Sequence, residues 1–348
     1  MKPYQELTHL GRVRRLRQLA QAALDAYGLA DARFKLLRQA GNTLFRVLAS
    51  DPTPPVAAND VFEEDQYLLR IHQPGYQATD AIELELAWLA AMCRDAHLPV
   101  PEPVPTLDGR LLMRVSIPGV PEERNCSLLR WLKGRYIKQD IRPHHYRAQG
   151  RLMARLHNFA AQWHPPAGLT KRRYDWGGLF ADDSGTGMPA SEAWPLLSPS
   201  CVEPFQVVAR RVRQIMDELG QGPGVYGLIH ADLGVDANLL FWKGEARAID
   251  FDDSGFGYWV YDLAVSLEHC REDAEYPQFR DALLDGYAEI RSLPEERLEH
   301  LPLFMAALDV YWSLWATAVM HLYPDHREAL AGRLERSARL VACYVAGC

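Results

Sequence analysis

The spacing of apolar residues divides the chain into a strand-rich first part and a helix-rich second part. In the first part, apolar residues occur in short runs bounded by turn residues, which is typical of strands. These runs predict strands at Phe34–Leu37, Leu44–Leu48, Gln66–Ile71, Arg110–Ile117 and Cys126–Leu132. Helical spacing dominates the second part and predicts long helices at His144–Trp163, Glu203–Leu219 and Leu303–Leu322.

The strand-rich part also contains two predicted helices, an early one that carries several arginines and a second at Thr79–Cys93. A proline-containing loop is expected at Asp51–Asp60, and the prolines of Pro99–Pro105 exclude a helix there. The pattern changes near Lys133-Gly134. The fold is therefore expected to be α+β with two lobes, residues 1–132 and residues 133–348, the first an antiparallel sheet with helix and the second mostly helical.

The composition fits an ordinary globular protein. The 348 residues are 48% hydrophobic and 24% charged, enough for a large core and two lobes. A net charge of −7 and a pI near 6.0 argue against nucleic acid or anionic lipid as the main partner, since both require a basic surface, and weakly favour a cationic substrate.

The sequence also indicates a cytoplasmic protein. The six cysteines show no C-x-x-C spacing, so we expect free thiols in a reducing compartment rather than a metal site. The N-terminus lacks the apolar core of a secretory peptide, and its arginine-containing helix is interpreted as a surface helix rather than an import signal. Asp309 lies within the apolar stretch Leu303–Leu322, which favours a buried core helix over a membrane span.

The candidate chemistry lies in the stretch that follows the apolar run Val225–Ile229. Asp232 is followed six residues later by Asn238, and then by Asp250 at the end of another apolar run. Phosphoryl transfer from a metal-bound nucleotide requires this set, because the carboxylate that accepts a hydroxyl proton must be separate from the oxygens that hold Mg²⁺. Asp232 is therefore the candidate base, and Asn238 and Asp250 are the candidate Mg²⁺ ligands.

Two neighbouring residues leave alternatives. Strand alternation would place Asp252 on the same face as Asp250, which makes Asp252 the second choice as a metal ligand. His230 has no second histidine or cysteine at ligand spacing, so a structural role in holding the loop is favoured over catalysis.

The first lobe offers donors for a nucleotide. Gly41 permits a tight turn that approaches phosphate oxygens, and Asn42 and Thr43 would add donors, although a plain hairpin would show the same pattern. Arg70 is a cation among apolar neighbours that needs a partner, and Glu85 on the following helix is well placed to provide one.

With these residues in view, the chain resembles the aminoglycoside phosphotransferase and choline kinase superfamily, whose fold is protein-kinase-like. The resemblance covers about residues 30–320 and includes the residues already described. It adds four further segments, Leu128–Gly134, Arg155-Leu156-His157, Ile229–Leu233 and Tyr261-Asp262-Leu263-Ala264.

The resemblance implies an ATP- and Mg²⁺-dependent kinase. Adenine would lie against a hinge at Arg130, Trp131 and Leu132, Arg70 would contact the phosphates while paired to Glu85, and Asp262 would brace the catalytic loop. Arginine at position 70 departs from the lysine of many members, although choline kinases also use it.

A second departure affects the catalytic loop. The asparagine follows the catalytic aspartate by six residues instead of the usual five. Gly234 could absorb the extra residue and leave Asn238 at the metal, or Asp236 could turn inward and replace it.

The acceptor cannot be named from the sequence. Asp309 and Trp312 share a helix face and could hold an amine, although core packing with Asp309 paired to an arginine is the favoured interpretation. The hypothesis we favour is a kinase of a small hydroxyl compound. The alternatives are a Ser/Thr protein kinase of the bacterial stress-response type and a nucleotide-binding pseudokinase. Nothing in the sequence indicates an oligomeric state.

Overall fold

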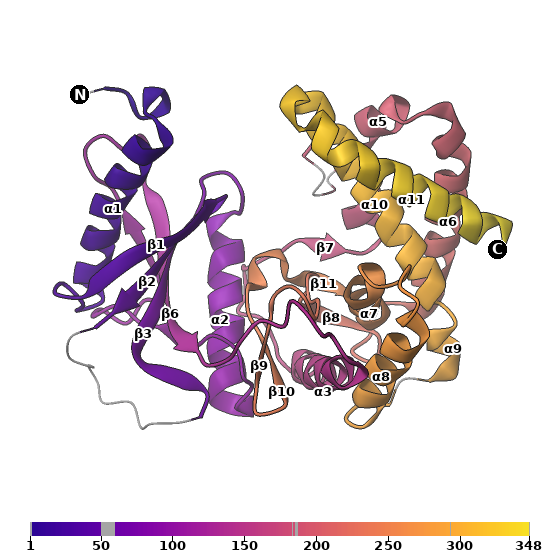
Figure 1. Cartoon of the computed structure of the whole chain (residues 1–348), viewed down its shortest axis with the longest axis horizontal. Helices are drawn as coiled ribbons and strands as arrows, with labels where there is room; N and C mark the ends of the chain where they lie inside the picture. Colours follow the sequence, from indigo (N-terminus) through magenta and orange to yellow (C-terminus); the bar gives the residue numbers. More distant parts are fainter. Residues whose placement is uncertain (1, 50–59, 183, 185–186, 293, 348) are drawn as a thin grey trace.

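A computed structural model of the chain describes residues 2–49, 60–182, 184, 187–292 and 294–347. The loop expected at Asp51–Asp60 lies outside the described residues except for Asp60, and so does Cys348. The described chain forms the two lobes expected from the sequence, with the sheet of the first lobe on one side of the molecule and the helices of the second on the other (Figure 1).

The first lobe is built on an antiparallel sheet with the strand order β1-β2-β3-β6-β4, to which β5 adds by pairing with β6. Its strands are β1 Arg33–Ala40, β2 Asn42–Leu48, β3 Phe62–Ile71, β4 Pro103–Val104, β5 Leu112–Val115 and β6 Arg124–Leu132. The short 3₁₀ helix η1 (Tyr4–Glu6) precedes α1 (His9–Ala26), whose apolar side chains pack on this sheet in a separate small core. The arginine-containing segment is thus a helix packed on the sheet, as expected.

Helix α2 (Thr79–Ala96) connects the lobes. It follows β3, and its buried face belongs to the main core that continues into the second lobe. Trp88 of α2 meets Phe251 edge to face, with ring centroids 5.6 Å apart. The segment that contains the candidate metal ligands is therefore packed directly against a first-lobe helix.

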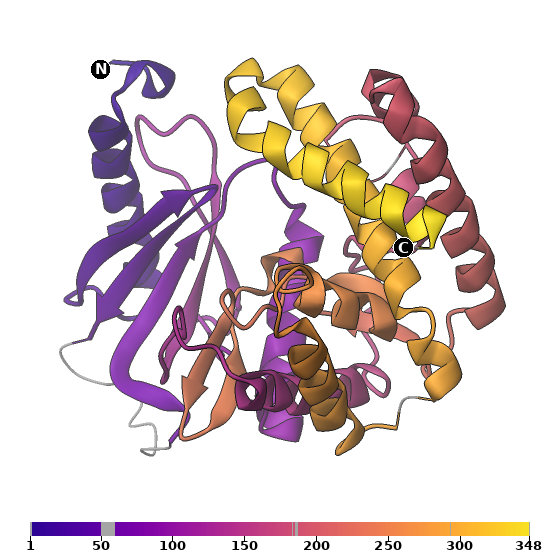
Figure 2. The same cartoon turned by 45° about the vertical axis from the view of Figure 1, so that its right-hand side comes forward.

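The second lobe is mostly helical (Figures 1 and 2). Its α-helices are α3 Pro143–Ala160, α4 Trp176–Phe180, α5 Ala190–Ala193, α6 Pro199–Leu219, α7 Trp259–Glu268, α8 Tyr276–Ala288, α9 Glu295–Leu298, α10 Leu301–Leu322 and α11 Arg327–Ala346. Three 3₁₀ helices lie between them, η2 Trp194–Leu196, η3 Phe251–Asp253 and η4 Pro324–His326.

Helix α10 is the core helix of this lobe. The stretch Glu295–Leu322 is long and apolar enough to cross a membrane by length and composition, but 78% of its most apolar window is buried inside the protein. Contacts with α6, α7 and α11 account for this burial. The preference for a core helix over a membrane span is confirmed.

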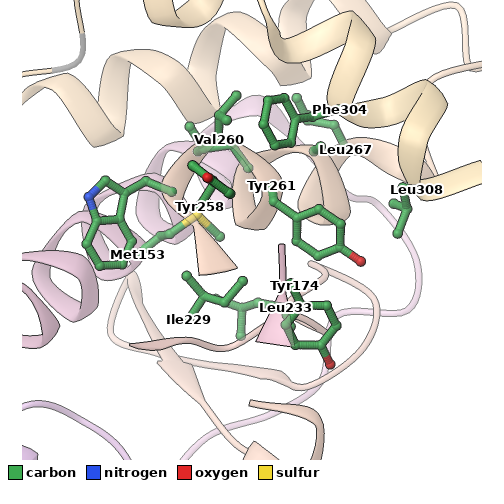
Figure 3. Packing of buried hydrophobic residues seen from close by; sticks show 14 of the residues in the cluster. Met153, Tyr174, Ile229, Leu233, Tyr258, Val260, Tyr261, Leu267, Phe304 and Leu308 are labelled. Carbon is green, nitrogen blue, oxygen red and sulfur yellow. The ribbon is translucent and has the colours of Figure 1, made fainter. Parts of the chain in front are cut away.

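Two small sheets frame the candidate site. The hairpin of β9 (Leu239–Trp242) and β10 (Glu245–Ala248) separates Asn238 from Asp250 along the chain and returns the second beside the first. The other sheet has the order β7-β11-β8, with β7 at Arg173–Tyr174, β8 at Tyr226–Ile229 and β11 at Gly255–Tyr258. Figure 3 shows the core behind this sheet, where Tyr174 and Tyr261 stack with centroids 5.2 Å apart.

Candidate active site

The catalytic loop places Asn238 directly against Asp232. The side-chain amide of Asn238 donates to the Asp232 carboxylate at 2.6 Å and to the Asp232 carbonyl at 2.9 Å. The backbone N–H of Ile249 donates to the Asn238 carbonyl at 2.9 Å, which ties the loop to the residue before Asp250. The three side chains singled out from the sequence are thus brought to one place.

The extra residue of the loop is absorbed in a small closed turn. Gly234 and Ala237 exchange backbone hydrogen bonds of 3.2 and 3.1 Å, so the two residues between them leave the path of the loop. Val235 is buried and Asp236 is exposed. The bulge at Gly234 therefore matches the first of the two sequence alternatives, with Asn238 beside the base and Asp236 turned outward.

Asp262 holds the start of the loop. Its carboxylate accepts the backbone N–H groups of His230 at 3.2 Å and Ala231 at 2.8 Å, and it bonds His157 Nε2 at 2.9 Å. Tyr287 bonds the other nitrogen of His157 at 2.8 Å, so a neutral ring protonated on Nε2 satisfies both partners. Burial opposes ionisation of Asp262, but these donors outweigh it and hold its pKa below the ordinary value.

His230 is buried and serves the same loop. Its Nε2 bonds the Ile249 carbonyl at 3.0 Å, and burial lowers its pKa, which favours the neutral ring. This geometry agrees with the structural role inferred from the sequence.

The environment of Asp232 makes its carboxyl a weaker acid than an ordinary aspartate. Burial is the largest cause that raises the pKa of its carboxyl to about 7. The negative charges of Asp253 and Asp250 act in the same direction, whereas the bond from Asn238 and the charge of Arg333 act against them. Asp232 therefore lies near the pKa at which a general base works best at neutral pH.

Asp250 and Asp252 have different surroundings. Residues 251–253 form the 3₁₀ helix η3, so the strand alternation assumed for the two acids is wrong. The Asp252 carboxylate is already bound by Arg70 and by the Asn42 side chain. The Asp250 side chain is 46% exposed, and its nearest cation, Arg70, is 3.7 Å away. Asp250 is therefore the better placed of the two to receive a metal ion.

Arg70 forms the expected ion pair with Glu85 at 2.8 Å, and both side chains are buried. Lys171, which the sequence interpretation did not single out, lies 3.6 Å from the other Glu85 oxygen. Its ammonium also donates to the Ser254 hydroxyl at 2.7 Å and to the Phe251 carbonyl at 3.1 Å. Two buried cations thus connect one glutamate of α2 to the segment that follows Asp250.

A cavity of 450 Å³ lies between the lobes. Arg70, Asn238 and Asp250 line one part of it. The rest is mainly apolar and includes the expected hinge residues Arg130, Trp131 and Leu132 together with Leu37, Arg38, Leu44, Leu68, Pro101, Leu129, Gly134, Tyr136, Leu240 and Ile249. An apolar cavity with a charged part suits a nucleotide, whose base is flat and whose phosphates are anionic.

The turn expected to touch the phosphates does not line this cavity. Gly41 has the left-handed φ of +71° that the tight turn requires. Asn42 uses its side chain to accept from the Gln73 backbone N–H at 2.9 Å and to donate to Asp252, and Thr43 is buried. The turn therefore ties the hairpin of β1 and β2 to the second lobe.

Asp309 does not form an amine site. It is buried, forms an ion pair with Arg271 at 2.5 Å and accepts from the Ser337 hydroxyl at 2.9 Å. The interpretation as core packing with an arginine partner is confirmed, and the amine-binding role for Asp309 with Trp312 is wrong.

A second polar cluster, which sequence reasoning missed, surrounds Asp253. Tyr76 and Arg172 bond one of its carboxylate oxygens at 3.0 and 3.2 Å, and Tyr174 donates to its carbonyl at 2.6 Å. The one signal was the basic run Lys171–Arg173, which is equally typical of an exposed loop.

Comparison with known proteins identifies the family of the chain. A sequence model of the phosphotransferase enzyme family matches residues 57–300. An uncharacterized protein of Deinococcus radiodurans is 27% identical over 308 residues, which are 87% of this chain and 81% of that protein. The homoserine kinase of Sinorhizobium medicae is 26% identical over 209 residues, which are 59% of each chain.

A solved structure of a microcompartment-associated aminopropanol kinase is also similar. It is 26% identical, covers 95% of this chain and 98% of its own, and superposes with a TM-score of 0.75. The two named relatives are kinases of small hydroxyl compounds, and no comparison supports the protein kinase or pseudokinase alternatives. The chain is a kinase that uses an alcohol group as acceptor, and it belongs to the phosphotransferase enzyme family.

Proposed function

We propose that this protein transfers the γ-phosphate of ATP to the hydroxyl of a small molecule, with Asp232 as the general base. The observation that carries the proposal is the contact between Asp232 and Asn238, because it joins the base to the cavity that Arg70 and Asp250 also line. Asp232 orients the acceptor hydroxyl for in-line attack and receives its proton.

Asn238 and Asp250 are the residues that would hold Mg²⁺. Both offer oxygen atoms, the ligands that Mg²⁺ prefers. Asn238 uses its side-chain nitrogen for Asp232, which leaves its oxygen without a protein partner among the described residues. When bound, the ion neutralises charge on the phosphate oxygens. Asp252 is occupied by Arg70 and Asn42, so its part is to hold the two lobes together.

The nucleotide would lie in the cavity between the lobes. Adenine rests against Arg130, Trp131 and Leu132, and Arg70, fixed by Glu85, contacts the phosphates. The turn at Gly41, Asn42 and Thr43 lies outside the cavity lining and holds the first lobe to Asp252 of the second. In this proposal residues 1–132 form the nucleotide-binding lobe and residues 133–348 form the catalytic lobe. We also propose that the protein works in the cytoplasm.

Turnover with a panel of acceptors tests this function. The purified chain is incubated with Mg-ATP and small hydroxyl compounds, including homoserine and aminopropanol, and both ADP and phosphorylated product are measured. Asp232→Asn should lower transfer by about 10²- to 10⁴-fold and leave ATP affinity within a few fold. Native-rate transfer by Asp232→Asn would refute the role of the base, and a panel with no phosphorylated acceptor would refute the function.

A further inference from the structure

Among the described residues, three arginines line the cavity between the lobes, and two of them are paired with acids. Arg70 is buried, forms an ion pair with Glu85 at 2.8 Å and also binds Asp252. Arg130 forms an ion pair with Glu102 at 2.8 Å. The positive charges of these two arginines are therefore already shared with carboxylates of the protein.

Arg38 is the third of these arginines, and its charge is free. It is exposed on β1, and no carboxylate of the described residues forms an ion pair with it. The same cavity is lined by Asp250, whose carboxylate adds negative charge where phosphates would lie. The Mg²⁺ complex of ATP is still an anion. Within the described lining of the cavity, Arg38 is thus the cation that can bind this anion without sharing its charge with an acid.

The sheet places Arg38 and Arg70 in one row. Arg38 of β1 is opposite Leu44 of β2, and Leu44 is opposite Arg70 of β3. Cross-strand partners project from the same face of a sheet, and all three residues line the cavity. Since neighbouring strands lie about 4.8 Å apart, the Cα atoms of the two arginines are separated by roughly 10 Å. Two guanidinium groups on long side chains can both reach a phosphate chain that lies against this face.

A β-bulge gives Arg38 this position. The register of β1 on β2 shifts by one residue between Leu36 and Arg38, which leaves Leu37 as the extra residue. In regular pairing Arg38 would be opposite Thr43, whose side chain is buried on the same face as Phe45. That face packs on α1, on the side away from the second lobe (Figures 1 and 2). The bulge therefore turns the charged side chain from the core to the cavity.

We propose that Arg38 binds the phosphate groups of the nucleotide from the side opposite Arg70. The inference rests on the proposed kinase function and adds a residue that holds ATP. A guanidinium group donates two parallel hydrogen bonds to phosphate oxygens. The contribution of Arg38 to affinity should therefore depend on the phosphates of the ligand and not on its base.

A series of nucleotides tests the proposal. The full chain and its Arg38→Met variant are titrated calorimetrically in the presence of Mg²⁺ with adenosine, ADP and a non-hydrolysable ATP analogue. Arg38→Met should weaken binding of the analogue about 10-fold, because hydrogen bonds between charged groups are lost, and should change adenosine binding less than about twofold. Arg38→Lys keeps the charge but not the two parallel donors, so its affinity for the analogue should lie between the other two.

Arg33→Met is the matched control. It makes the same substitution at an exposed arginine of β1 that does not line the cavity. Arg33 lies roughly 16 Å along the strand from Arg38, further than the ~10 Å over which charges interact at 0.1 M salt. The affinities of this variant for all three ligands should equal those of the native protein.

The outcomes separate the inference from the function on which it rests. The inference is overturned if Arg38→Met leaves the affinity for the analogue unchanged, or if it weakens adenosine as much as the analogue. In both cases the kinase function stands, provided that the native protein binds the analogue and phosphorylates an acceptor. A native protein that binds neither adenosine nor the analogue would refute the proposed function and the inference together.

Discussion

Asn238 donates its side-chain N–H to the carboxylate of Asp232 at 2.6 Å, although the loop between them carries one residue more than the family pattern. The turn closed by Gly234 and Ala237 takes up the extra length. The same amide can therefore orient the base through its nitrogen and offer its oxygen to a metal ion.

This double role predicts a metal defect. Asn238→Ala should raise the Mg²⁺ concentration needed for half-maximal ATP turnover by about 10- to 100-fold, by analogy with the loss of residues that support metal ligands. Asp236→Ala, in the same loop but exposed, should change it less than twofold. Titration of both variants with Mg²⁺ at saturating ATP measures the difference. The opposite ranking would make Asp236 the ligand.

The pKa of Asp232 predicts an acidic limb in the rate profile. Because the base must be ionised and its pKa is raised to about 7, kcat/KM should fall about tenfold per pH unit below that value. The charge of Asp253 is one cause of the raised pKa, so Asp253→Asn should move the limb to lower pH. Profiles of both proteins between pH 5 and 9 test this. A profile that stays flat down to pH 5 would show that Asp232 titrates as an ordinary carboxyl.

The raised pKa of Asp232 also predicts that a neutral residue at this position stabilises the folded protein. A carboxyl whose pKa is higher in the folded than in the unfolded protein binds more protons when folded, so its contribution to stability is lost as pH rises from about 4 to 7. Asp232→Asn should therefore unfold at higher urea concentration than the native protein at pH 8, by about 1–3 kcal/mol. The gain should vanish near pH 4, and a gain independent of pH would contradict an origin in the buried charge of Asp232.

The lobes and most elements follow from local sequence. Alternation or short apolar runs predicted the strands that became β2, β3 and β6, and helical spacing predicted α3 and α6. Asp232, Asn238 and Asp250 could also be predicted from the sequence, because they lie within one stretch of chain whose spacing is characteristic. Local patterns carry information about what lies nearby along the chain.

Contacts between distant segments could not be predicted in this way. Asn42 looked like a phosphate donor, but its side chain bonds Asp252, 210 residues later, and only the docking of the lobes brings the two together. Lys171, Tyr76 and Arg333 likewise acquire their neighbours from the tertiary fold. The 3₁₀ helix after Asp250 was missed for another reason: Asp250 has a φ of +64°, which is incompatible with a continuing strand and which alternation of residue types does not indicate.

Asp262 is predicted to be essential for the shape of the loop. Asp262→Asn replaces one carboxylate oxygen, an acceptor, by an NH₂ group, which is a donor. That NH₂ group would face the N–H of His230, Ala231 or His157, so two buried donors would meet without an acceptor. We expect a loss of about 2–4 kcal/mol in the free energy of unfolding. Asp217→Asn, an exposed acid of α6, should change it by less than about 0.5 kcal/mol. Urea unfolding of the two variants provides the comparison, and equal stabilities would argue against the brace.

Arg70 and Lys171 share the buried carboxylate of Glu85, which predicts that their removal is not additive. Arg70→Met leaves Lys171 3.6 Å from Glu85, and Lys171→Met leaves Arg70 at 2.8 Å, so each single variant retains one cation for the acid. The double variant leaves Glu85 buried with neither cation, a state in which the charge is poorly compensated. The double loss should therefore exceed the sum of the single losses, by about 0.5–3 kcal/mol in the free energy of unfolding.

A second cycle on a Glu85→Gln background separates this explanation from a general effect of removing two long side chains. Glutamine keeps the shape of Glu85 but carries no charge, so the one acid that forms an ion pair with both cations among the described residues is lost, and the excess loss should fall to within about 0.5 kcal/mol of zero. Chemical unfolding of the eight proteins measures both cycles. An excess that persists with glutamine would mean that Arg70 and Lys171 are coupled through packing or through the carbonyl groups of η3 instead of through Glu85.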